Sequence, residues 1–194
     1  VMIEKLVYSQ SGDTLLLESY NSKGKKDGNW IGYSNDWFVK GNYKDGILVD
    51  GKSTSYYENG QISYERNYKD GEQDGKWTSY YENGRIEKEE NYKDGKEDGK
   101  WTRYYKNGQI WYEKNYKDGK YDGKWTTYDY YGSIKKVEEY KDGKLIKYTS
   151  YYKNGQIWEE GNYKDGNLDG KWTSYYENGQ IKSEENYKDG KLIK

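Results

Sequence analysis

The sequence predicts an all-β protein, an elongated single-sheet solenoid of about eight consecutive antiparallel β-hairpins. A unit of about 24 residues recurs along the chain, with Gly-containing turn dipeptides at fixed positions between segments in which aromatic and polar residues alternate. Tyr and Trp, which favour strands, are abundant: the 194 residues include 27 Tyr and 8 Trp, but no Pro. Hairpin repeats of this kind account for both observations.

Composition limits the classes of partner. Charged residues make up 35% and hydrophobic residues 31%, a balance that favours disorder unless large aromatic side chains, here 19%, supply buried area. The formal net charge of -1 gives no general attraction to a polyanion, so we expect no nucleic-acid partner. No apolar run approaches the roughly 18 to 20 residues that cross a bilayer, so we expect no membrane insertion.

The elements follow in order along one predicted repeat domain, residues 1–194. Residues 1–28 are predicted to be a diverged N-terminal capping hairpin, with the aliphatic cluster Leu15, Leu16 and Leu17. Residues 29–51 are a shortened repeat. Residues 52–194 are regular repeats that end in mid-repeat.

The regular repeats carry two turn signals. Asn-Gly is typical of type I′ turns, which need positive φ at both central residues, so each repeat is interpreted as one hairpin closed by Asn-Gly. The Asp-Gly of each "KDG" segment is interpreted as the start of the connection to the next hairpin. The Asn-Gly glycines are Gly60, Gly84, Gly108, Gly155 and Gly179, and Tyr131-Gly132 is the exception. The structural Trp positions of the repeat are Trp77, Trp101, Trp125 and Trp172.

A fold at Asn83-Gly84 predicts which side chains share a face. The two-residue register pairs Tyr81 with Ile86, Ser79 with Lys88 and Trp77 with Glu90. Because side chains alternate along a strand, we expect one packed face that holds Trp77, Tyr81, Ile86 and Tyr92.

The opposite face is predicted to be solvated and mostly polar, with Lys residues beside a row of Glu–Thr pairs. The expected pairs are Thr54–Glu65, Thr78–Glu89, Thr102–Glu113, Thr149–Glu160 and Thr173–Glu184. Aromatic residues also recur on this face, where Trp111 and Trp158 are expected to lie opposite Tyr104 and Tyr151. They either form a ligand or partner surface or stabilise a thin sheet by cross-strand pairing. The candidate surface residues are Tyr80, Tyr104, Trp111, Tyr151, Trp158 and Tyr175.

The sequence lacks the residues of most catalytic sites. The chain has no His and no Cys, which removes the usual general base, thiol nucleophile and nitrogen or sulfur metal ligands. Adjacent carboxylates such as Glu89-Glu90 point to opposite faces of a strand and cannot converge on one substrate. The Asp/Gly loops at 94–99 and 165–170 suit either calcium or simple turns. We expect no catalytic residues, no metal and no cofactor.

The order of strand, Asn-Gly turn, strand, "NYKDG" and "DGKW" resembles the MORN repeat, particularly its bacterial variant. The resemblance is strongest from Lys52 to Lys194 and weaker before residue 45, where Trp37 and Phe38 interrupt the pattern. It implies a single-sheet solenoid with one hairpin per repeat, used for protein contacts, for scaffolding or, in some eukaryotic members, for lipid association. Some bacterial proteins with this variant are labelled antitoxins, a role that none of these residues supports directly.

The sequence therefore predicts a bacterial, non-enzymatic repeat module that mediates protein–protein interaction or scaffolding through an aromatic-rich sheet surface. The alternative is a carbohydrate- or cell-wall-binding repeat module. We expect a protein partner, and self-association through an open edge strand is a further expectation. No signal peptide is visible, so location in the envelope or outside the cell requires that a signal segment has been removed.

Overall fold

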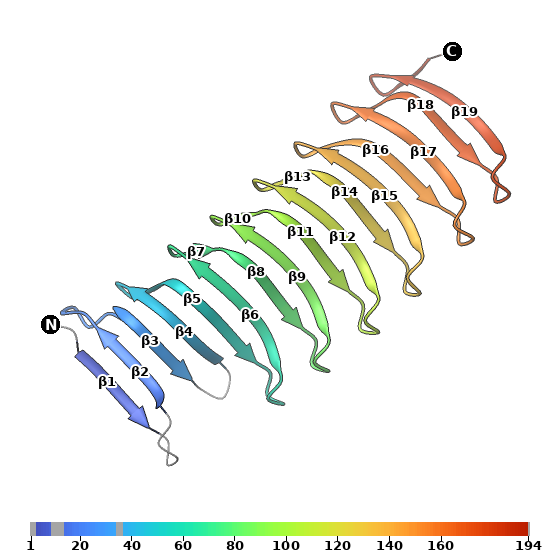
Figure 1. The fold of residues 1–194 in the computed structure, drawn as a ribbon. Coiled ribbons are helices and arrows are strands. Elements are labelled where there is room, and N and C mark those ends of the chain that lie inside the picture. Colours follow the sequence, from blue (N-terminus) through green and yellow to red (C-terminus); the bar gives the residue numbers. More distant parts are fainter. Residues whose placement is uncertain (1–2, 9–13, 34–36, 194) are drawn as a thin grey trace. The chain divides into compact units, whose positions relative to one another are not determined.

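The structure is a computed structural model that describes residues 3–8, 14–33 and 37–193 (Figure 1). These residues form strands and tight turns, which confirms the predicted all-β class. None of them belongs to a helix long and apolar enough to cross a membrane. The chain divides into two compact units, residues 1–96 and 97–194. Within each unit, consecutive strands pair antiparallel in one open layer.

The strands have the following bounds. The first unit contains β1 (Ile3–Tyr8), β2 (Thr14–Tyr20), β3 (Gly28–Tyr33), β4 (Trp37–Lys44), β5 (Ile47–Tyr56), β6 (Ile62–Lys69), β7 (Glu72–Gln73), β8 (Gly75–Tyr80) and β9 (Ile86–Lys93). The short strand β10 (Lys96–Glu97) lies at the division. The second unit contains β11 (Gly99–Tyr104), β12 (Ile110–Lys117), β13 (Lys120–Tyr121), β14 (Gly123–Tyr128), β15 (Ile134–Lys141), β16 (Lys144–Tyr151), β17 (Ile157–Lys164), β18 (Asn167–Tyr175), β19 (Ile181–Lys188) and β20 (Lys191–Ile193).

The Asp-Gly turns are two-residue hairpin turns. Lys141 and Lys144 pair directly across Asp142 and Gly143, whose φ angles are 49° and 82°. Positive φ at both central residues of a two-residue loop defines type I′, and Asp and Gly tolerate it best. The interpretation of "KDG" as the start of a longer connection is therefore wrong, because this segment closes a hairpin of its own.

The Asn-Gly turns are one residue longer than predicted. The Tyr105 N–H donates to the Gln109 carbonyl at 2.8 Å, and the Gly108 N–H donates to the Tyr105 carbonyl at 2.9 Å. Only Gly108 of the three loop residues has positive φ, at 92°. This is the three-residue loop, a type I turn followed by a left-handed residue. The predicted type I′ turn at Asn-Gly is therefore wrong.

The longer loop changes the register of each hairpin next to it. Ser79 pairs with Lys88 and Trp77 with Glu90, as predicted, but Ile86 pairs with Tyr80. The prediction that Tyr81 faces Ile86 is wrong, because Tyr81 closes the loop by accepting from the Gly84 N–H at 2.8 Å.

One residue per hairpin is consequently skipped in the backbone pairing and forms a β-bulge. In the hairpin of β8 and β9 it is Glu87, between the Ser79–Lys88 and Tyr80–Ile86 pairs. The six bulge residues of the regular hairpins are Ser63, Glu87, Trp111, Lys135, Trp158 and Lys182.

Asn side chains tie neighbouring Asn-Gly turns together. Asn154 accepts from the Gln156 N–H at 3.0 Å and donates through Nδ2 to the Glu177 carbonyl of the next turn at 2.8 Å. Asn59 and Asn107 bridge to their next turns in the same way. Three Asn-Gly turns of the second unit, residues 105–109, 152–156 and 176–180, and the equivalent Tyr131-Gly132 turn at 129–133 lie along one edge of its sheet, here called the Asn-Gly edge (Figure 1).

Replacing Asn154 with Ala is expected to destabilise the second unit by roughly 1–2 kcal/mol, because two hydrogen bonds of about 1 kcal/mol each are lost. Urea unfolding measures this change. Asn178→Ala is the matched control, because Asn178 makes only local contacts with Gln180. Equal losses for the two variants would show that the bond between turns contributes nothing.

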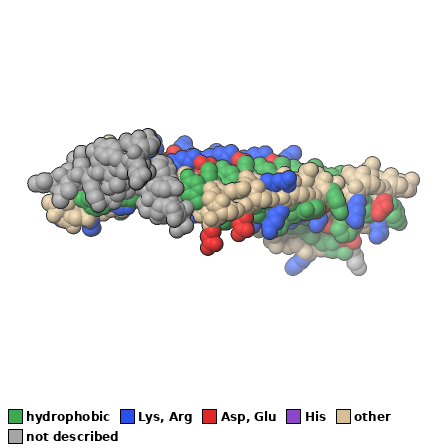
Figure 2. Space-filling view, turned by 90° about the horizontal axis from the view of Figure 1, so that it is seen from below, with side chains coloured by type: hydrophobic (Ala, Val, Ile, Leu, Met, Phe, Trp, Pro, Cys, Tyr) green, Lys and Arg blue, Asp and Glu red, His purple; other side chains and the backbone are tan. Residues whose placement is uncertain are grey.

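Each unit is a single layer, so its side chains are buried by neighbouring side chains on the same face of the sheet. Among the described side chains, Trp30 is the one large hydrophobic residue that is buried, at 4% exposure. The buried polar residues are mostly the Thr and Ser of the hairpin strands, such as Thr102 and Ser150. Figure 2 accordingly shows hydrophobic, basic and acidic side chains side by side on the visible surface.

Candidate functional site

The predicted polar face carries a repeated Lys–Glu–Tyr arrangement. All five predicted Thr–Glu pairs form. Lys52 Nζ lies 2.5 Å from Glu65 Oε1, and the Tyr80 hydroxyl, from the next repeat, donates to Glu65 Oε2 at 2.7 Å. Tyr175 donates to Glu160 in the same way, at 2.8 Å. The Glu carboxylates of this face therefore join one repeat to the next.

These contacts shift the pKa values of Glu65 and Tyr80. Burial raises the pKa of Glu65, but hydrogen bonds from Lys52 and Tyr80 outweigh it and lower the pKa overall. Burial, followed by the hydrogen bond to the Glu65 carboxylate, raises the pKa of Tyr80 to about 12. Both shifts favour the protonated tyrosine beside the ionised glutamate, which is the pair that the hydrogen bond requires.

Four of the six candidate surface residues lie in this Tyr row. Tyr80, Tyr104, Tyr151 and Tyr175 are half-buried. The hydroxyls of Tyr80 and Tyr175 donate to glutamate carboxylates. This geometry gives at least these two residues a role in holding successive repeats together.

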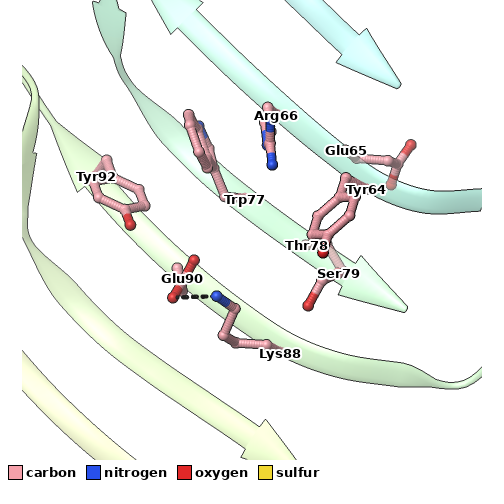
Figure 3. A pocket seen from close by; sticks show the side chains of 9 residues that line it. All are labelled: Tyr64, Glu65, Arg66, Trp77, Thr78, Ser79, Lys88, Glu90 and Tyr92. Atoms are coloured by element: carbon pink, nitrogen blue, oxygen red, sulfur yellow. Dashed lines mark ion pairs between the residues drawn. The ribbon is translucent and has the colours of Figure 1, made fainter. Parts of the chain in front are cut away.

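The opposite face of the first unit holds a small cavity of about 200 Å³ around Trp77 (Figure 3). As predicted, Trp77 packs against Tyr92, with ring centroids 5.1 Å apart. The guanidinium of Arg66 lies over the rings of Tyr64 and Trp77, at 4.8 and 5.2 Å from their centroids. Cation–π contacts of this kind stabilise the face between neighbouring repeats.

The same cavity lacks the groups for hydrolysis. Its buried carboxylate, Glu90, is neutralised by Lys88 at 2.9 Å. Figure 3 shows Glu65, the other lining carboxylate, pointing away from Glu90. Two carboxylates on opposite faces cannot flank one substrate bond. Among the described residues there is also no cluster of three or more Asp and Glu that could hold a metal ion. In the Asp/Gly loop at 165–170, Asp169 binds Lys188 at 3.1 Å.

The remaining two candidate residues, Trp111 and Trp158, lie at the Asn-Gly edge. The prediction that they face Tyr104 and Tyr151 is wrong, because those tyrosines pair with Ile110 and Ile157. Both tryptophans occupy the bulge position and are exposed, Trp111 at 37% and Trp158 at 48% of the full side-chain surface. A bulge residue has no cross-strand partner, which leaves its side chain free to turn outward.

Further aromatic side chains of the turns extend this exposed surface. Trp111 stacks on Tyr105 with a centroid distance of 5.5 Å and an interplanar angle of 25°. Tyr105 in turn contacts Tyr130 edge-on at 5.3 Å, and Tyr130 contacts Tyr131 at 5.9 Å. Tyr130 is 51% and Tyr131 is 86% exposed. Four aromatic rings from two successive hairpins thus form one connected surface.

A groove of about 520 Å³ opens beside this surface. It lies between the turn that joins β14 to β15 and the turn that joins β16 to β17, and two adjacent tyrosines, Tyr151 and Tyr152, form part of its wall. Its full lining is Asp129, Tyr130, Tyr131, Ser133, Ile134, Lys135, Tyr151, Tyr152 and Lys153. Of the candidate residues, the groove therefore includes Tyr151, while Trp158 lies next to Tyr152 at a centroid distance of 6.2 Å.

Tyr130, Tyr131 and Ile134 line the groove but were not among the predicted surface residues. The signal was present, because Tyr131-Gly132 is the one turn of the regular series that is not Asn-Gly. Tyr at this position is unusual, because Asn is among the residues that favour turns.

The model of the MORN repeat variant matches five segments, residues 49–70, 73–94, 97–118, 144–165 and 168–189, which together cover more than half of the chain. The chain belongs to the MORN repeat variant family. The predicted resemblance is thereby confirmed, and the chain is a repeat module built of MORN hairpins. No curated protein matches it. The five MORN segments leave out residues 119–143, and this is the repeat that carries Tyr130 and Tyr131.

Proposed function

We propose that this MORN repeat chain is a non-catalytic module that binds another protein through the Asn-Gly edge of its second unit. The observation that supports the proposal is a connected row of rings in which Trp111, Tyr130 and Tyr131 are exposed and are joined by the half-buried Tyr105. Trp and Tyr are the side chains most enriched at the centres of protein interfaces, where they bury large area at low entropic cost.

A single-layer sheet cannot bury these rings by itself. Elsewhere in the second unit, aromatic side chains cover one another on the face of the sheet, as Tyr121 and Trp125 do at 5.5 Å and 25°. At the Asn-Gly edge, by contrast, Tyr105, Tyr130 and Tyr131 follow the last paired residues of their strands, and Trp111 occupies the bulge position. Contiguous exposed apolar surface of this kind is typical of an interaction site.

Absence of catalysis is part of the same proposal. MORN repeats are generally non-catalytic. The chain contains no His and no Cys, and the buried Glu90 is neutralised by Lys88. The usual general base, His, is therefore missing, and the ion pair with Lys88 makes Glu90 a poor general base.

Carbohydrate binding is the second candidate, because exposed tryptophans also stack on sugar rings. At Trp111, however, Tyr105 already stacks on the indole, and the Arg103 guanidinium lies 5.1 Å from its centroid. A sugar platform needs a free ring face, whereas a protein anchor inserts by its edge as well. The geometry at Trp111 thus favours a protein partner.

The test is an affinity capture from lysate and envelope fractions of the source organism, quantified by mass spectrometry. It compares the unmodified chain with the Trp111→Ala/Trp158→Ala variant. We expect one protein to be captured by the unmodified chain and reduced about tenfold or more by the double substitution, because losing hot-spot aromatics costs 2 kcal/mol or more.

Ile146→Ala is the matched control, since Ile146 is equally exposed but lies in β16 towards the Asp-Gly turn. Capture that is unaffected by Trp111→Ala/Trp158→Ala, or equally reduced by Ile146→Ala, would contradict the proposed surface. Recovery of wall polysaccharide that competes with free sugar would instead support carbohydrate binding.

A further inference from the structure

The turn at 129–133 keeps the loop geometry of its neighbours without their Asn. Asp129 Oδ1 accepts from the N–H groups of both Tyr131 and Ser133, at 2.8 and 3.0 Å. The Asp129 N–H still donates to the Ser133 carbonyl, which closes the same three-residue loop. Asp129 therefore takes over the capping role, and position 131 no longer needs an amide side chain.

The presence of Tyr instead of Asn at position 131 also changes the contact between this turn and the next one along the Asn-Gly edge. In the neighbouring turns, Asn107 and Asn154 donate to the following turn and draw the two loops together. Tyr131 has no amide and cannot make this bond to the turn at 152–156. The groove lies at this position, between two turns that no Asn bridges.

The charge of the groove differs from that of the same positions in the first unit. Lys135 and Lys153 line the groove, are exposed, and have no ion-pair partner among the described residues. The single acidic lining residue, Asp129, is occupied at Oδ1 by two N–H groups. In the first unit the position of Lys135 is occupied by Ser63 and Glu87, and the position of Lys153 by Glu58 and Glu82, so neither position carries a cation there.

We propose that this groove binds an acidic peptide segment of a partner protein, with one aromatic or aliphatic side chain inserted between the two turns. The inference rests on the proposed function and specifies its partner. Tyr131, Ile134 and Tyr152 supply the apolar walls, while Lys135 and Lys153 contact carboxylates on either side of the anchor. The volume suits an anchor side chain with its neighbours, since ligand sites span about 300–1,000 Å³.

The first experiment is a selection from a random peptide display library on the full chain. Binders of the Tyr131→Asn variant are removed beforehand. This variant restores the residue found in the other regular turns, so it is expected to fold at least as stably as the unmodified chain. We expect the enriched peptides to share an aromatic or aliphatic residue flanked by Asp and Glu. Enrichment of basic or uncharged peptides would overturn the inference.

The second experiment measures the affinity of one enriched peptide by fluorescence anisotropy. The double substitution Lys135→Glu/Lys153→Glu is expected to weaken binding about tenfold or more, and added salt is expected to weaken binding to the unmodified chain. Lys182→Glu/Lys191→Glu is the control with the same change of charge, because both lysines are exposed in the second unit and neither lines the groove. An equal loss in both double variants would overturn the inference.

Different results would contradict the proposed protein-binding function and the inference of an acidic peptide partner. If enriched peptides need Trp111 and Tyr131 but carry no acidic residues, the edge is an interaction surface and only the acidic partner is wrong. If a peptide or protein binds the chain with no dependence on Trp111, Trp158 or Tyr131, the proposed function is wrong as well.

Discussion

Substitution of Gly161 by Ala is expected to destabilise the second unit by roughly 1–3 kcal/mol, the usual effect of overpacking. Gly161 pairs with Tyr148 on one side and with Trp172 on the other. The two rings stack above it, with centroids 5.8 Å apart and planes at 12°. A Cβ at position 161 would lie 2.1 Å from Trp172 Cε3, so the indole must leave its place.

Urea unfolding followed by tryptophan fluorescence measures this effect. The control is the same substitution in a Trp172→Ala background, where the clash no longer exists. We expect the Gly161→Ala cost to vanish there, which makes the two substitutions strongly non-additive. Additive costs would mean that the rings do not stack over Gly161 in solution.

Alkaline pH is expected to unfold the protein between about pH 10 and pH 12. Burial raises the pKa of Tyr140 to about 12, and burial with the Glu65 hydrogen bond does the same for Tyr80, against an ordinary value of 10.0. A raised pKa means that the folded state holds the proton more tightly than the unfolded chain does. The resulting stability is complete below pH 10 and is lost as the pH rises through 12. The pKa is also raised for Tyr43, Tyr57, Tyr105, Tyr116, Tyr128, Tyr163, Tyr175 and Tyr187.

Urea midpoints across this pH range, together with phenolate absorbance, test the expectation. Tyr80→Phe should lessen the pH dependence of the first unit, because one shifted group is removed. The control is Tyr131→Phe, a change at a side chain that is 86% exposed. Phenolate absorbance that develops fully near pH 10 with no change in the urea midpoint would contradict the prediction.

The regular hairpins could be predicted from local sequence because their strongest signals agree. The predicted Thr78–Glu89 and Trp77–Glu90 pairs form because the bulge at Glu87 offsets the extra residue of the loop. The two turn types could not be separated, because both Asn-Gly and Asp-Gly tolerate positive φ. Whether Asn-Gly or Asp-Gly closes a two-residue loop depends on how the flanking strands pair. Because the Asn-Gly loop is one residue longer than predicted, Tyr81 faces Arg85 instead of Ile86.

The candidate surface was predicted in part for a related reason. Trp111 and Trp158 were identified because an aromatic residue stands where the repeat is usually polar. Tyr80 and Tyr175 were identified by the same rule, but their hydroxyls reach glutamates one repeat earlier. That contact depends on the distance between hairpins, which a single repeat does not contain. Tyr131 was overlooked because it was treated as an irregular turn residue.

The bulge residue beside each three-residue loop makes the hairpin tolerant of different side chains. Ser, Glu, Trp and Lys all occur there, at Ser63, Glu87, Trp111, Lys135, Trp158 and Lys182, and the pairing on either side is the same in all six hairpins. At the four exposed positions, Trp111, Lys135, Trp158 and Lys182, mutation can therefore change what a hairpin recognises without disturbing how it folds. A protein engineer could use these four positions, one in each hairpin of the second unit, to introduce a new binding specificity.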